Sequence, residues 1–440
     1  MARQGTILRL IPTSILLPAL VMLASLGLYS KGAGAQQQRG VVAEGYITAV
    51  HPPLGFDVNG MHVATTPAAG YRLVGEKAAQ KDSPLRDAVQ VGAYVVVEGR
   101  FDKRTRTANA KTVVFRDDGA WKLFGLGVID KVVSNGPEPV FRSDGYEIYI
   151  NSDSKVEFQG QLKTLADVGL NTWIRFEGRR NKDGVVVASK AMFFAANAER
   201  IKEIPRIEVV DAAFEAPDMD QHKDGRVQLG PFDARHVIPA DRNLQERVTR
   251  VGMSVVPSYQ KTIPDGSPFK LDFHFYAVDD DKLRSDGCVL HGNLILISKQ
   301  AVERLKNDSQ LAAVLADGIA LDMQRQKSST RHENYFQTEP FVVDALLVPP
   351  VFFVFHDIGG FFQKVAIVAV EQRGRIALAL MADAGYDPWQ APEAWRLLAP
   401  ENLPSDLNSL KYPNRSGYQL GILNLQYRTK ADLPIVKPAP

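Results

Sequence analysis

Hydrophobic and polar positions alternate in short runs along residues 40–198, and these runs predict β-strands. The runs at 94–97 and 173–176, YVVV and WIRF, are rich in β-branched and aromatic residues, and polar turn segments follow them. Three segments recur in the same order about 80 residues later, a spacing that indicates duplicated domains. They are GYITAV and GVIDKV, VGAYVVVEGR and VGLNTWIRFEGR, and AKTVVF and SKAMFF. The pattern therefore predicts two small all-β units in tandem, at 40–118 and 119–198.

Each unit is expected to form a small closed barrel of about five strands, similar to OB-like barrels. Closure removes exposed strand edges, which helps a small β unit that has no disulfide. Barrels of this kind often bind nucleic acid or sugars through aromatic side chains on one face. We interpret the aromatic residues here as packing residues, namely Phe115, Trp121, Phe193 and Phe194. A ligand-binding module in the barrels, with the C-terminal half as structural support, is the alternative function.

The hydrophobic spacing becomes helical after residue 241. The preceding segment, 199–240, mixes proline, aspartate and glycine and predicts a linker that carries at most a hairpin. Residues 270–280 alternate as a strand does. One helical face is formed by Leu244, Val248, Val251 and Val255. We therefore expect an α+β, mainly helical domain at 241–430, followed by a proline-rich tail at 431–440.

The first 35 residues have the pattern of a signal peptide. Arg3 and Arg9 precede an uncharged apolar run at 10–28, and Ala33-Gly34-Ala35 offers small residues for cleavage. The run is also about as long as a membrane span, so an uncleaved anchor in the inner membrane is the alternative. Both interpretations predict an exported protein, either periplasmic or secreted.

Composition narrows the function classes. The chain has 440 residues, a length typical of about three domains, with 45% hydrophobic and 23% charged residues and a formal net charge of +2. Nucleic-acid binding needs a concentrated basic face, which this balance does not suggest. Cys288 is the single cysteine, so no disulfide forms within the chain.

Five segments of the C-terminal half follow one another in a recognisable order. They are NLQERVTRVG, FHFYAVDD, HGNLILISKQAVERL, SQLAAVLADGIALDMQRQ and VEQRGRIALALMADAGYDPWQAPEAWRLL. This order resembles the HExxH zinc metallopeptidases of the HtpX and CAAX-prenyl-protease type, over roughly residues 243–427. The resemblance implies a zincin-like domain whose motif helix spans 309–326. Asp308 or Ser309 is expected to cap that helix.

The residues that perform the chemistry of that family are absent from the matching positions. In the family, two histidines one helical turn apart bind zinc, and the glutamate after the first activates water. Carried over, these three positions hold Asp317, Gly318 and Leu321. The positions of the third ligand and of a supporting aspartate hold Val370 and Gly374. We therefore expect no catalytic residue, no metal and no cofactor, although the family uses zinc.

A rebuilt site is the alternative on which an active metalloendopeptidase with non-standard ligands would depend. Its candidate ligands are Asp317, His332, His356 and Glu371. Glu371 is adjacent to the lost ligand position, but one helical step rotates it by about 100°. A metal site rebuilt from these residues is the less favoured interpretation, and the favoured one is a peptidase-like protein without catalysis.

A protein that has lost catalysis can still bind peptide. The resemblance implies an edge strand that pairs with extended substrate through main-chain hydrogen bonds. Its expected residues are Gly292, Asn293, Leu294, Ile295, Leu296 and Ile297. The predicted partner is therefore a peptide or an unfolded or envelope protein, in a binding or assembly role. The apolar segments 10–28 and 342–370 are candidates for membrane association, and the oligomeric state stays open.

Overall fold

The computed structural model describes most of the chain between residues 40 and 427. The exceptions are 54, 59–60, 75–77, 82, 117–121, 182, 196–226, 230–235, 268, 280–287, 292–293, 330–357 and 399–413. The predicted signal peptide or anchor and the proline-rich tail lie outside the described residues. Most of the predicted linker lies outside them as well.

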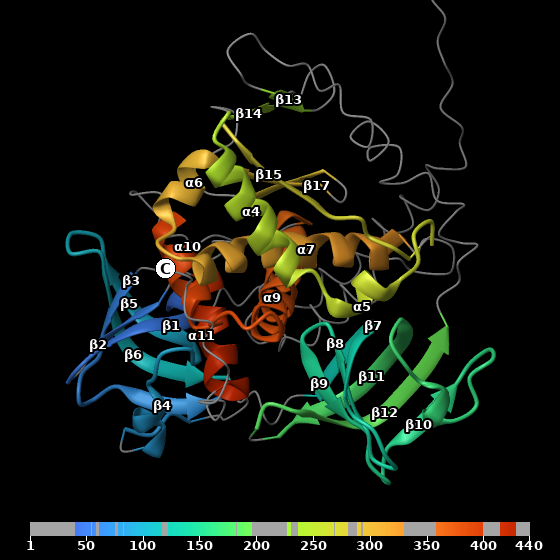
Figure 1. Cartoon of the computed structure of the whole chain (residues 1–440). Helices are drawn as coiled ribbons and strands as arrows, with labels where there is room; N and C mark the ends of the chain where they lie inside the picture. The colour runs from blue at the N-terminus through green and yellow to red at the C-terminus, as the bar shows by residue number, and fades with distance from the viewer. Residues whose placement is uncertain are drawn as a thin grey trace, which may run out of the picture. The chain divides into compact units, whose positions relative to one another are not determined.

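The first β unit is a closed sheet of six strands, drawn in blue in Figure 1. The strands run in the order β3-β2-β1-β5-β6-β4, and a parallel pairing of β3 with β6 closes the sheet. Buried apolar residues such as Phe56, Val63 and Val113 fill its interior. The elements are β1 (Val41–His51), β2 (Gly55–Val58), β3 (Met61–Ala64), β4 (Gly70–Leu73), the 3-10 helix η1 (Pro84–Ala88), β5 (Tyr94–Asp102) and β6 (Thr107–Phe115).

The second β unit repeats this arrangement. Its order is β10-β12-β11-β7-β8-β9, closed by a parallel pairing of β12 with β9. Each strand corresponds to the strand six places earlier in the first barrel, so the expected tandem of barrels is confirmed. The elements are β7 (Lys122–Ser134), β8 (Val140–Ser143), β9 (Tyr146–Tyr149), β10 (Lys155–Phe158), η2 (Leu165–Asp167), β11 (Thr172–Arg180) and β12 (Val186–Ala195).

The expected number of strands was too low by one in each barrel. Three strands of each barrel have four residues each, among them β4 and β10, which pair in parallel with the last strand of their barrel. Runs this short carry too few positions for a clear period of two, so they resemble loop in the sequence. Phe115 and Phe193 are buried, in agreement with their interpretation as packing residues, whereas Phe194 is half-buried and Trp121 lies outside the described residues.

The remaining described elements form a mainly helical part with a small sheet, drawn from yellow-green to red in Figure 1. Val248, Val251 and Val255 are buried on one helix, which confirms the predicted helical face. The elements are the hairpin β13 (Val227–Leu229) and β14 (His236–Ile238), α4 (Arg242–Val255), α5 (Ser258–Thr262), β15 (His274–Val278), β16 (Cys288–His291), β17 (Leu294–Ser298), α6 (Lys299–Arg304), α7 (Asp308–Ser329), α9 (Ile358–Asp383), α10 (Gln390–Leu398) and α11 (Asn414–Gln426).

The cap of α7 differs from the expected one. The side chain of Asn307 accepts a hydrogen bond from the backbone N–H of Gln310 at 2.9 Å, so Asn307 caps the helix. Asp308 instead pairs with Arg247 and Arg250 of α4, each at 2.8 Å. The prediction was wrong by one residue because asparagine and aspartate are equally good caps.

None of the described helices is both long enough and apolar enough to cross a membrane. Both segments proposed for membrane association, 10–28 and most of 342–370, lie outside the described residues.

Candidate functional site

Asp317, which the resemblance to zinc metallopeptidases would align with their first histidine ligand, lies in a buried ion cluster. Its side chain is 8% exposed, and its Oδ2 atom lies 3.5 Å from Nη1 of Arg415 and 3.9 Å from Nη1 of Arg373. The three residues come from three helices, α7, α9 and α11. Two guanidinium groups thus face the one carboxylate that the resemblance offers as a metal ligand.

The charges of this cluster oppose cation binding. Burial lowers the pKa of Arg415, the charge of Asp317 counteracts that effect, and the charge of Arg373 adds to it. The guanidinium carbon of Arg415 also lies 4.1 Å from the ring centre of Trp395, within range of a cation–π contact. A divalent cation at Asp317 would have to displace two fixed positive groups, so the geometry suits an internal ion pair.

The other family positions hold no ligand atom where their side chains are described. Gly318 is buried and Leu321 is half-buried. Gly374 packs against α11, where an added Cβ would meet Tyr418 and Gln419 at 3.6 Å. For Val370 only the backbone, within α9, is described.

The proposed replacement ligands are not brought together among the described residues. Glu371 accepts a hydrogen bond at 3.0 Å from the hydroxyl of Tyr46, on β1 of the first barrel. Asp317 is paired with arginines instead. His332 and His356 lie outside the described residues, so their part of the alternative stays a prediction.

The expected edge strand is the middle strand of its sheet. β17 pairs in parallel with β15 and antiparallel with β16, so the edge assignment of Leu294 to Ile297 was wrong. All five residues of β17 are buried. A continuous apolar run of this kind is typical of a strand covered on both faces. Gly292 and Asn293 lie outside the described residues.

The two outer strands of this sheet differ in how their free sides are used. On β15, the side-chain amide of Gln245 donates to the carbonyl of Phe275 at 2.8 Å and accepts from the N–H of Ala277 at 3.0 Å. This amide therefore occupies main-chain groups that an added strand would need. β16 pairs with β17 on one side, and no second described strand pairs with it.

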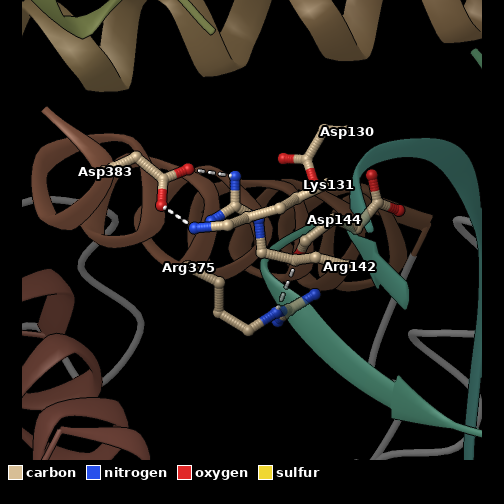
Figure 2. Close-up of polar contacts among 6 residues, drawn as sticks. All are labelled: Asp130, Lys131, Arg142, Asp144, Arg375 and Asp383. Atoms are coloured by element: carbon tan, nitrogen blue, oxygen red, sulfur yellow. Dashed lines mark hydrogen bonds and ion pairs between the residues drawn. The ribbon is translucent and has the colours of Figure 1, made fainter. Parts of the chain in front are cut away.

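A polar cluster joins the second barrel to α9 (Figure 2). The carboxylate of Asp383 accepts hydrogen bonds from Nη2 of Arg142 and from Nζ of Lys131, each at 2.6 Å. Nε of Arg142 also lies 2.9 Å from Oδ1 of buried Asp130. Burial by itself raises the pKa of Asp383, but the hydrogen bonds and charges of Arg142 and Lys131 outweigh it and lower that pKa. Burial raises the pKa of Asp130, and Arg142 opposes that shift.

Sequence reasoning missed the partners in these clusters. Arg373 and Arg415 stand 42 positions apart and belong to no spacing motif, so only the packing of α7, α9 and α11 reveals their role. It also missed a group on the first barrel, His51, Asp57 and His62, whose ligand atoms lie within 4.8 Å of one another. The available signal was His51 at the end of the first strand and His62 on the third strand of the same barrel.

Residues 44–120 match the model of DUF5666, a domain of unknown function. The match includes most of the first barrel, whose strands span Val41–Phe115. A comparison of the chain with curated proteins finds no match. The sequence comparisons thus identify the first barrel as similar to DUF5666 domains.

Proposed function

We propose that the protein is an exported, non-catalytic relative of the zinc metallopeptidases that binds extended polypeptide. The observation that carries this proposal is the pairing of Asp317 with Arg373 and Arg415. Where the resemblance would require a metal ion between two helices, guanidinium groups supply positive charge instead. The ion cluster and the apolar contacts around it then connect α7, α9 and α11 without metal.

The polypeptide is proposed to bind along β16, not along β17. An extended peptide adds to a sheet through the unpaired N–H and C=O groups of an edge strand. Gln245 already occupies such groups on β15, while Cys288–His291 has one strand partner among the described elements. The proposed role, chaperoning or assembly in the cell envelope, depends on this peptide site and on the predicted export signal.

Backbone amide exchange with an unfolded model peptide tests this role. A saturating peptide is expected to slow exchange in Cys288–His291, because new main-chain hydrogen bonds form there. A peptide of the same sequence that is N-methylated at alternate residues is the matched control, since it lacks the required donors. The proposal fails if neither peptide changes amide exchange in β16. It also fails if both peptides slow this exchange equally.

A further inference from the structure

We propose that the first barrel carries a binding site for a divalent transition-metal ion, formed by His51, Asp57 and His62. Nε2 of His51 lies 2.8 Å from Oδ2 of Asp57, and Nδ1 of His62 lies 3.0 Å from its Oδ1. The two imidazole rings are 5.4 Å apart, measured between their centres. One carboxylate thus stands between two imidazoles at the surface of the barrel.

Strand pairing produces this arrangement. Asp57 on β2 lies directly opposite His62 on β3, and His51 at the end of β1 lies opposite Gly55 on β2. Phe56 and Val58 alternate with Asp57 and point into the barrel core, so Asp57 points outward. His62 is likewise flanked by the buried residues Met61 and Val63. All three side chains therefore reach the same outer face.

Gly55 provides room for the second imidazole. A Cβ atom at that position would lie only 3.0 Å from Cε1 of His62. Because glycine stands there, the ring of His62 can lie across β2 and approach Asp57.

The donor set suits a transition metal. Two imidazoles and one carboxylate are typical ligands of Zn²⁺, Cu²⁺ and Ni²⁺, whereas Mg²⁺ and Ca²⁺ prefer oxygen ligands alone. Donors at about 2.0–2.1 Å from a tetrahedral zinc lie roughly 3.3 Å from one another. The donor atoms here span no more than 4.8 Å, so small side-chain rotations bring them onto one ion. Three protein ligands leave a fourth position for water or another ligand.

The second barrel offers an internal comparison. The third residue of β8 and the second residue of β9 correspond to Asp57 and His62, and they are Arg142 and Glu147, which also lie opposite each other. Arg142 is buried and pairs with Asp383 of α9. In the second barrel this position of the fold therefore contacts a helix. In the first barrel the same position presents metal-ligating side chains to solvent.

Titration of the full-length protein with Zn²⁺ and with Co²⁺ tests the site. One ion per chain is expected, and bound Co²⁺ should give the visible absorption of a low-coordinate nitrogen and oxygen site. His51→Ala and His62→Ala should each weaken binding at least tenfold. Both side chains are about half exposed, at 50% and 47%, so the variants should fold, as circular dichroism will verify.

The matched control is His274→Ala. His274 is also exposed and lies 3.3 Å from a carboxylate, that of Asp272, but it belongs to no described group of three metal-ligating side chains. This variant should bind zinc as the unaltered protein does. The proposal is overturned if the unaltered protein binds no stoichiometric ion, which would leave Asp57 as a bridge between two imidazoles only. It is overturned equally if the His51 and His62 variants bind normally or if His274→Ala causes the same loss.

Discussion

At the scale of single residues, Asp317 illustrates what the sequence predicted and what it did not. The absence of a ligand at Leu321 and of a base at Gly318 follows from the side chains alone. The sequence does not predict that Asp317 pairs with Arg373 and Arg415, because those residues come from other helices. Sequence spacing describes positions on one helix face, whereas an ion pair between helices depends on their packing.

Removing the carboxylate of Asp317 tests the ion cluster. Asp317→Asn leaves two largely buried guanidinium groups without the carboxylate that they face, so the free energy of unfolding should fall by about 3–5 kcal/mol. Chemical denaturation measures this loss. Asp272→Asn is the control, because the Asp272 side chain is 78% exposed, and exposed pairs contribute about 0–1 kcal/mol. Equal stability of Asp317→Asn and the unaltered protein would mean that the cluster does not stabilise the helices.

At the scale of elements, periodicity located several strands and helices but not their neighbours. The LILI run in β17 was correctly identified as a strand. Its apolar residues at every position, instead of at alternate ones, indicate a central strand. Hydrophobic spacing does not predict that β16 pairs antiparallel with β17 on its second side.

Gln245 is expected to protect the outer side of β15. Gln245→Ala removes the amide that binds Phe275 and Ala277, which should speed exchange of the Ala277 amide. The variant should also lose about 1–3 kcal/mol of stability, since buried main-chain groups lose their partner. Asn243→Ala, an exposed position on the same helix, should change neither quantity. Unaltered exchange at Ala277 in the Gln245 variant would show that another group protects this edge.

At the scale of the whole molecule, the duplication was visible in the sequence but its divergence was not. Both barrels keep the same strand order. The corresponding positions Asp57 and Arg142 nevertheless differ in chemistry and in partners. The repeat predicted two copies of one fold, whereas the contacts of each copy depend on outward-facing residues that vary between them.

The contact between the second barrel and α9 should depend on pH. Arg142 and Lys131 lower the pKa of Asp383 in the folded protein. Ionised Asp383 therefore stabilises the folded protein fully above the ordinary aspartate pKa of about 3.9. This stabilisation is lost as the pH falls through the lower pKa that Asp383 has in the folded protein. Asp383→Asn should therefore cost about 1.5–3 kcal/mol at neutral pH, and this difference should shrink below about pH 4.

Denaturation of both proteins from pH 7 to pH 3 measures that difference. Asp183→Asn, at an exposed turn of the second barrel, is the control and should cost little at any pH. A cost of Asp383→Asn that stays constant over this range would contradict the ionic origin of the contact.

The most direct test of the central claim, a peptidase-like helical part without a metal, is the zinc content of the His51→Ala/His62→Ala double variant after incubation with zinc. The double variant removes the site proposed on the first barrel, so any remaining zinc must bind elsewhere. Elemental mass spectrometry is expected to find close to no zinc per chain, because Arg373 and Arg415 occupy the surroundings of Asp317. One tightly bound zinc per chain, lost when Asp317→Asn is added, would contradict the account.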